Sequence, residues 1–265
     1  RRNGKEYFTD FIELKQTPPI DSISWAPTVR RDGINIYANT HDEVGNSPYY
    51  QWTFVETWEY NSKYYPSYET RNGVVFPTTV NVNTCWKTIP SSEIHTASAT
   101  QLSENAIRNF QLVFIPKRSQ KLSRRYSIIV EQRSLTEEAY DFWTELKKTT
   151  ENLGGLFDPM PSKVVGNVRS QDDTGEPVLG YFSGGSTTKQ RIFIHPGELP
   201  GDIWEYPVLG CPVDSIPVAQ ISNYPSMLLI GTYGMPVTEG YTTAGDRNCM
   251  DCRDDGGDII RPDFW

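Results

Sequence analysis

Residues 49–60 read YYQWTFVETWEY, and this stretch decides the fold. Successive side chains of a β-strand point to opposite faces, so a period of two puts every second residue on one face of a sheet. The even positions here are almost all aromatic, and they are Tyr50, Trp52, Phe54, Glu56, Trp58 and Tyr60. The odd positions carry Gln, Thr and Glu, which suit a wetter face. We expect the aromatic face to lie in the hydrophobic core; the alternative is a platform on which glycans or bases stack.

The rest of the chain also favours short strands joined by turns. It contains 15 Tyr, 11 Phe and 7 Trp, with 20 Gly and 19 Pro to punctuate it. Further strand-like runs cover residues 20–25, 33–39, 110–116, 125–132, 163–168, 177–183 and 190–195. The sequence therefore predicts a mainly β fold, an Ig- or fibronectin-like β-sandwich.

One helix is expected to interrupt the strands, over about residues 134–153. Ser134 and Glu137 have the S-x-x-E spacing of a capping box, and apolar residues follow at helical spacing. Gly154 and Gly155 would supply the C-terminal cap. A shorter helix is expected within residues 100–110, with Ser103 as its cap.

The chain divides into two parts by pattern. Residues 1–195 are expected to form the sandwich with its inserted helix. Residues 196–265 are rich in Pro and Gly, and we expect a loop-rich extension, pinned by disulfides and packed on the same domain. The first residues, RRNGKEYFTDF, resemble the middle of a domain, so we expect further chain upstream, with any targeting signal in it.

Charge and hydropathy exclude two classes of partner or location for these residues. The chain has 25 basic and 33 acidic residues, a net charge of −8, and its one basic cluster, PKRSQKLSRR at 116–125, reads as a solvated connection. Nucleic-acid binding depends on neutralising phosphates, so we expect none. No apolar run approaches the roughly 20 residues of a membrane-spanning helix.

Few residues are arranged as an active site would require. His41, His95 and His195 are far apart in sequence, and each is expected at the surface or in a loop; residues 40–46, THDEVGN, read as a turn. Glu56 is the most interesting acid, because it shares a face with aromatic rings, where burial would raise its pKa. We expect it to pair with a cation or to lie at the sheet margin. The sequence thus predicts no catalytic residue and no cofactor.

The cysteines have a spacing that several chemistries share. Cys249 and Cys252 form a C-x-x-C pair, and the remaining two are Cys85 and Cys211. A zinc ribbon needs a second ligand pair and a thioredoxin-type site needs a following helix, and neither is present. Four cysteines in a loop-rich chain favour two disulfides and an oxidising compartment. We expect Cys85 and Cys211 each to bond one member of the pair; the alternative is Cys249–Cys252 with Cys85–Cys211.

Two further sets of residues are weaker candidates. Acidic side chains around the C-x-x-C are candidate calcium ligands, although their spacing does not fit an EF-hand: Asp251, Asp254, Asp255 and Asp258. Trp204 and Tyr206 are candidates for a contact surface, with a loop anchor in the core as the alternative.

These motifs together resemble the domain-of-unknown-function 4249 (DUF4249) family of Bacteroidota outer-membrane lipoproteins. The resemblance rests on residues 49–60, on the helix region 125–168, on VLGYFSGGSTTKQRIFI at 178–194 and on the ending CMDCRDDGGDIIRPDFW. It implies an upstream Ig-like domain and an N-terminal lipobox cysteine, which these residues do not contain.

The resemblance implies a lipid-anchored protein of the cell outer membrane that faces the exterior. We expect a non-enzymatic accessory, ligand-binding or capping subunit of a TonB-dependent receptor or another outer-membrane β-barrel. The alternatives are a structural subunit of a larger outer-membrane assembly and a hydrolase of glycans or peptides.

Overall fold

The computed structural model describes residues 5–45, 47–151, 164–171, 176, 178–201, 203, 210–234 and 237–265. Strands dominate, which confirms the mainly β prediction. The strands before the helix are β1 (Tyr7–Phe8), β2 (Ile20–Pro27), β3 (Gly33–His41), β4 (Tyr49–Asn61), β5 (Tyr68–Arg71), β6 (Val74–Pro77), β7 (Thr84–Pro90), β8 (His95–Ser98), β9 (Ala106–Pro116) and β10 (Arg125–Leu135). After helix α1 (Glu137–Glu151) follow β11 (Arg169–Ser170), β12 (Thr187–Ile194), β13 (Val213–Pro217), β14 (Leu228–Leu229), β15 (Gly231–Tyr233) and β16 (Gly240–Ala244). The short 3₁₀ helices are η1 (Gln120–Leu122), η2 (Pro196–Glu198), η3 (Val218–Asn223), η4 (Arg247–Cys249) and η5 (Cys252–Asp255).

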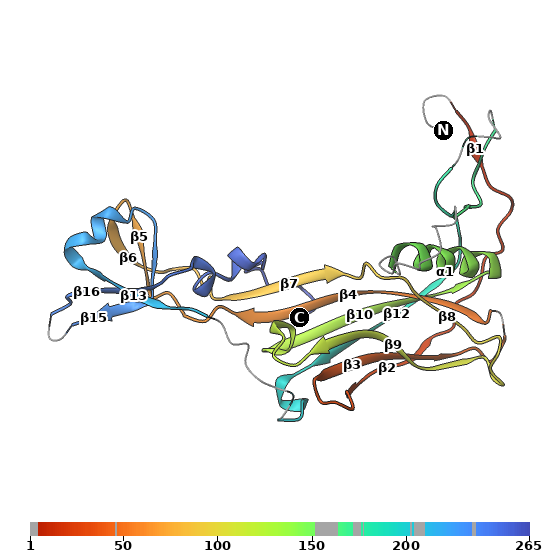
Figure 1. The fold of residues 1–265 in the computed structure, drawn as a ribbon, viewed down its shortest axis with the longest axis horizontal. Helices are drawn as coiled ribbons and strands as arrows, with labels where there is room; N and C mark the ends of the chain where they lie inside the picture. Colours follow the sequence, from red (N-terminus) through yellow and green to blue (C-terminus); the bar gives the residue numbers. More distant parts are fainter. Residues whose placement is uncertain are drawn as a thin grey trace, which may run out of the picture.

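Two antiparallel sheets form a sandwich (Figure 1). The larger sheet has the order β12-β10-β4-β7, and β8 pairs with the first half of β4 on the edge where β7 pairs with the second half. The smaller sheet has the order β2-β3-β9. One core fills the space between them, with Ile34 and Ile36 from the smaller sheet packed in the same cluster as Ile128 and Val130 from the larger.

Strand β4 supplies the aromatic side of this core, as its period of two predicts. Tyr50, Trp52 and Tyr60 are at most 1% exposed, and Phe54 and Trp58 are 7% and 4% exposed. The rings stack in sequence: the centroid of the Trp52 ring lies 5.9 Å from that of Tyr50 and 4.4 Å from that of Phe110 in the opposite sheet. A stacking platform for ligands is therefore not available on this face.

Helix α1 covers one end of the sandwich and starts later than its sequence signal indicates. Ser134 pairs with Tyr50 in the β-ladder, so it belongs to β10 and cannot cap a helix. The cap is Thr136, whose hydroxyl accepts a hydrogen bond from the Ala139 amide at 3.3 Å. Strand pairing with β4 thus overrides the capping box. The proposed glycine cap at Gly154–Gly155 lies outside the described residues.

The segment between β4 and β7 and the C-terminal part of the chain together build a lobe beyond the ends of β4 and β7, on the left in Figure 1. We call this the distal lobe; it comprises β5, β6, β13–β16 and η3–η5. Two small sheets form it, β14-β5-β6 and β13-β16-β15, so residues after 210 contain paired strands where the sequence indicated only loops. Its strands have two to five residues, too few for a recognisable period. Gly73 is required where β6 meets η3, because it has φ +75° and a Cβ there would lie 2.8 Å from the Ser222 carbonyl oxygen.

Three further sequence predictions are wrong. Residues 106–110 belong to β9 and not to a helix, because pairing with β3 outweighs their weak helical pattern. Residues 164–168 and 178–183 form no strands. Nearby β11 pairs over only two residues with β1, so these apolar runs have no ladder to join.

Candidate functional site

The ionisable group that the sequence singled out, Glu56, is bound inside the sandwich. It is 5% exposed, and the Lys121 ammonium donates to both carboxylate oxygens at 2.7 Å. The Tyr126 hydroxyl donates to Glu56 Oε1 at 2.8 Å, and burial followed by the nearby carboxylate raises the pKa of Tyr126 well above 10. The Lys121 ammonium also lies 5.3 Å from the centre of the Trp58 ring. The pair with a cation that the sequence predicted is present, and these contacts give Glu56 a structural role.

The histidines differ from the expectation at one position. His95 is only 5% exposed, because β8 carries it into the core, where its ring lies 5.3 Å from Phe54 and 6.4 Å from Phe110. It is therefore a core residue and not a surface one. His195 is exposed at the start of η2, and His41 is exposed at the end of β3.

The four cysteines form two disulfides, and each disulfide contains one cysteine of the C-x-x-C pair. Cys85 bonds Cys252, and Cys211 bonds Cys249. Cys85 and Cys252 belong to the main core of the sandwich, whereas Cys249 belongs to a separate small core of the distal lobe with Ala244 and Met250. The two cysteines of the pair therefore attach to different cores.

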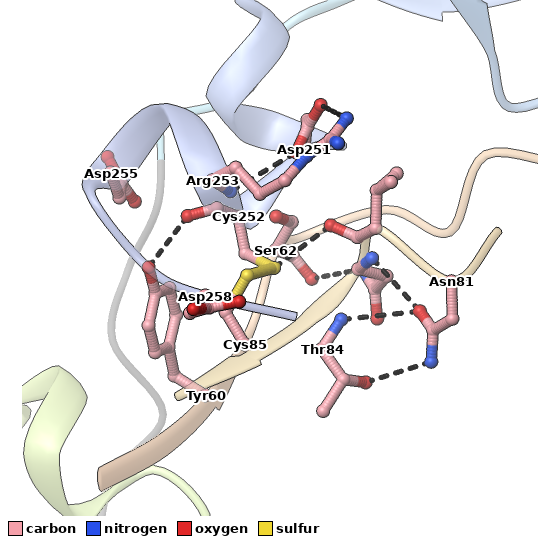
Figure 2. Close-up of a disulfide and its surroundings, with 12 residues drawn as sticks. Tyr60, Ser62, Asn81, Thr84, Cys85, Asp251, Cys252, Arg253, Asp255 and Asp258 are labelled. Atoms are coloured by element: carbon pink, nitrogen blue, oxygen red, sulfur yellow. Dashed lines mark hydrogen bonds and ion pairs between the residues drawn. A yellow bond between two sulfur atoms is a disulfide. The ribbon is translucent and has the colours of Figure 1, made fainter. Parts of the chain in front are cut away.

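The Cys85–Cys252 disulfide is embedded in hydrogen bonds at the junction of sandwich and lobe (Figure 2). The Tyr60 hydroxyl donates to the Cys252 carbonyl at 2.7 Å, and burial raises the pKa of Tyr60 to about 12, which keeps this donor protonated. The Cys252 amide donates to the Val82 carbonyl at 2.9 Å. Both sulfur-bearing residues are fully buried. The arrangement is that of a structural crosslink.

Asp251, between the two cysteines, is a fully buried carboxylate held by two arginines. Arg253 donates to both of its oxygens, at 2.8 and 2.7 Å, and Arg247 donates to one at 3.1 Å. Burial alone would raise the pKa of Asp251, but the hydrogen bonds from Arg253 and Arg247 outweigh it and hold the pKa below 3.8. The segment from Arg247 to Arg253 thus closes on itself.

The candidate calcium ligands do not converge. Asp251 is occupied by arginines, Asp254 lies 3.4 Å from Arg247, and Asp258 accepts a hydrogen bond from the Ile260 amide. Figure 2 shows Asp255 and Asp258 away from the Asp251 carboxylate. Across the described part of the chain, no three His, Cys, Asp or Glu side chains are grouped so that they could hold a metal ion.

The two aromatic candidates, Trp204 and Tyr206, lie outside the described residues. The chain's last residues do anchor on the sheet. Trp265 is 9% exposed, its indole donates to Glu59 at 3.1 Å, and its ring meets that of Phe193 at 5.7 Å. The backbone of Asp258 also pairs with Trp86 of β7. The C-terminal segment therefore fastens the lobe's last turn to the outer face of the larger sheet.

A polar depression that the sequence did not predict lies at the end of the smaller sheet opposite the lobe. It has a volume of about 590 Å³, and His41, Asp21, Asn39 and Arg108 are among its lining residues. His41 Nδ1 lies 2.7 Å from Asp21, and Nε2 lies 3.5 Å from Glu43. The hydrogen bond and the charge of Asp21 raise the pKa of His41 above 6.5. Thr40 and His41 of the THDEV segment thus line a concave surface.

The distal lobe presents a surface of the opposite kind. Residues 72–86 and 215–238 contain no charged residue, in a chain that is 22% charged. Among the described residues of the lobe and its connecting loops, seven large hydrophobic side chains are exposed, namely Tyr65, Val74, Phe76, Val80, Val213, Val218 and Val237. We call them the lobe surface. Arg71 of β5 pairs with Val74 and lies 5.6 Å from the centre of the Phe76 ring, so a cation borders this surface. A group of exposed apolar residues with polar residues at its rim is typical of contact surfaces.

Fold and junction define the chain as a disulfide-crosslinked β-sandwich protein with an appended β lobe. The chain belongs to the family described as domain of unknown function (DUF4249), whose model matches residues 1–191. The match ends before the lobe strands β13–β16 and the C-x-x-C pair. No curated protein and no solved structure gives a significant match. No helix in the described residues is long and apolar enough to cross a membrane.

Proposed function

We propose that this chain is part of a lipid-anchored outer-membrane protein of a Bacteroidota species, and that it acts as a non-enzymatic binding or capping subunit of a TonB-dependent transporter. The membrane anchor and the transporter come from the family resemblance. The lobe surface is the observation that carries the proposal, because a subunit of a larger assembly needs a surface suited to a partner.

The position of the lobe surface supports a contact role. Strand β6 and helix η3 adjoin at Gly73 and Ser222, so Val74 and Val218 come from neighbouring elements. Val74 is 56% exposed and Val218 is 45% exposed. Interface cores are depleted of charge, and residues 72–86 and 215–238, which contain Val74 and Val218, have no charged residue. The Cys85–Cys252 disulfide ties the lobe to the sandwich and Cys211–Cys249 closes the lobe itself, which would give the partner a preformed surface.

The interior chemistry agrees with a non-enzymatic role. Glu56 is engaged by Lys121 and Tyr126, and all four cysteines are bonded to one another. These residues are the candidates for acid–base or thiol chemistry that the sequence pattern singles out. Each is used to hold the fold together.

Affinity purification from detergent-solubilised outer membranes tests the proposal. The full-length lipidated protein is compared with variants Val74→Lys and Val218→Lys, and with Val29→Lys as control, since Val29 is fully exposed on a turn of the sandwich. We expect a β-barrel transporter to co-purify with the wild type and the control, and to be lost from the two lobe variants.

Other outcomes separate the alternatives. A stable complex without any transport barrel would favour the structural subunit. A protein that purifies alone and cleaves glycans or peptides would favour the hydrolase and overturn the proposal. Equal recovery of the barrel with all variants would remove the lobe surface as its contact.

A further inference from the structure

The polar depression is built by two β-bulges that meet at one end of the smaller sheet. On β2, Asp21 is an extra residue between the pairs Ile20–Thr40 and Ser22–Asn39. On β9, Arg108 and Asn109 both face Asn39, between the pairs Phe110–Ala38 and Ile107–Thr40. Bulges redirect side chains and are common beside functional sites. Here they turn Asp21 and Arg108 toward the same depression.

Asn39 holds the two bulges together. Its amide nitrogen donates to Ser22 Oγ at 3.1 Å, and its oxygen accepts from the Asn109 backbone amide at 2.7 Å. Asn109 has φ +54°, a left-handed conformation that is uncommon for residues other than glycine. Such a conformation persists only when its surroundings fix it, and it is frequent where a surface is shaped for a ligand.

The charges in the depression are compensated by Asp21 within it and by Glu43 and Glu104 beside it. His41 lies between Asp21 and Glu43, and Arg108 pairs with Glu104 at 3.3 Å. No excess of positive charge is present to attract a phosphate or sulfate, and the described residues provide no metal-ion site. What remains is a set of donors and acceptors in a small area: imidazole, carboxylate, guanidinium, amide and hydroxyl. This set suits a neutral ligand with many hydroxyl groups.

The sheet face extends this surface with uncharged polar and aromatic side chains. Ile34, Ile36, Ala38 and Thr40 of β3 point into the core, so Asn35, Tyr37, Asn39 and His41 point outward. Tyr37 is two residues from Asn39, which places it about 7 Å along the strand. Its neighbours across the sheet are Ser24 and Gln111. An aromatic ring among amides and hydroxyls offers both stacking and hydrogen bonds.

We propose that this face, from the His41–Asp21 depression to Tyr37, binds an uncharged saccharide. Ring hydroxyls would bond Asp21, His41 and Arg108, and a neighbouring sugar would lie against Tyr37. The inference rests on the proposed function as a binding subunit and names its ligand class. The site lies at the end of the sandwich opposite the lobe (Figure 1), so a bound saccharide would leave the lobe surface free.

Calorimetric titration of the purified chain tests the site without any transporter. The probes are hexasaccharides of α-linked glucose, β-linked glucose, mannose and N-acetylglucosamine, with dextran sulfate as an anionic comparison. We expect at least one hexasaccharide to bind and dextran sulfate not to bind. Arg108→Ala and Tyr37→Ala should each weaken the dissociation constant by at least about tenfold, the loss of roughly one good polar or stacking contact. Arg30→Ala, an exposed arginine on the turn at the other end of the sheet, should not.

The outcomes are distinct from those of the proposed function. Absence of binding to all four hexasaccharides, or binding that is equal in Arg108→Ala and wild type, overturns the saccharide site even where the barrel co-purifies. Binding of dextran sulfate alone points to an anion site and overturns it as well. If the protein binds a saccharide but recruits no barrel, the saccharide site stands and the proposed role as a subunit of a transporter is overturned. Thermal denaturation of Tyr37→Ala checks that the variant is folded.

Discussion

Removing the Cys211–Cys249 disulfide should open the distal lobe while the sandwich stays folded. The perturbation is the double variant Cys211→Ala/Cys249→Ala, which leaves no free thiol. The bond closes a loop of 38 residues, and the chain-entropy model gives about 4 kcal/mol for such a loop. The lobe has little else to offset this loss, since its buried apolar cluster consists of Ala244, Cys249 and Met250, and Ile216 and Leu229 are the further buried apolar side chains in the described part of its strands.

The same arithmetic predicts a different result for Cys85→Ala/Cys252→Ala. That bond spans 167 residues, which corresponds to about 5 kcal/mol. Both residues are fully buried in the main core, so their loss also leaves a cavity there. This variant should therefore lose stability over the whole sandwich, and its melting temperature should fall.

Hydrogen exchange followed by mass spectrometry distinguishes the two variants. In Cys211→Ala/Cys249→Ala, amides of residues 213–244 should exchange up to about a thousandfold faster, which corresponds to about 4 kcal/mol. Amides of β4 and β10 should keep their protection. In Cys85→Ala/Cys252→Ala, protection should fall in both regions. If the first variant lost protection in β4 and β10 as much as in the lobe, the two cores would be one cooperative unit and the reasoning would be refuted.

Three other perturbations follow from single contacts. Lys121→Met should destabilise the protein by about 2 kcal/mol, because it leaves buried Glu56 without its cation. This loss is smaller than that expected for a fully buried ion pair, because the Lys121 side chain is 26% exposed. Thermal denaturation should show this loss, with Lys117→Met, an exposed lysine nearby, as the unaffected control. Trp265→Ala should lower the free energy of unfolding by about 3 kcal/mol, because it removes the burial of the indole and its hydrogen bond to Glu59. The control Phe264→Ala should lower it by about 1 kcal/mol, because Phe264 is half-exposed. Similar losses for both variants in urea denaturation would contradict an anchoring role for Trp265. His41 should titrate above pH 6.5 by NMR, and Asp21→Asn should lower its pKa. Because the folded state raises this pKa, the stabilising contribution of protonated His41 is complete below pH 6.5 and is lost as pH rises through the raised value.

The sequence predicted the parts of the fold in which one element carries its own signal. The period of two in residues 49–60 gave both the strand and its buried face, because burial on one side of a long strand leaves a pattern in the side chains. The pattern of residues 134–153 predicts helix α1 for the same reason, although the helix begins at Glu137 and not at Ser134. That shift reflects the pairing of Ser134 and Leu135 with Tyr50 and Tyr49, which no local pattern reveals.

The polar depression could not be predicted, because it depends on strand register. Asn39 and Asn109 are 70 residues apart and meet only because β3 and β9 pair with a bulge between them. The sequence signal that existed was the cluster His41, Asp42 and Glu43, which reads equally well as a turn. Asp21 is the extra residue of β2, and the bulge it forms places it beside His41, so that His41 lines a concave surface.

The C-x-x-C pair shows why spacing alone does not decide chemistry. A metal site or a redox site needs both sulfur atoms directed to one place. Here Cys252 points into the sandwich core and Cys249 into the lobe core, and between them Asp251 is buried under two arginines. The four residues from Cys249 to Cys252 therefore contribute buried side chains to both cores. The position of the lobe relative to the saccharide-binding face depends on this segment together with the chain that leaves β4 and enters β7. There the Ser62 amide donates to the Asn83 carbonyl at 2.9 Å, and the Asn83 side-chain amide donates to the Ser62 carbonyl at 2.9 Å. A partner bound at the lobe and a ligand bound at the far end of the sandwich would thus be joined through a rigid, covalently closed connection.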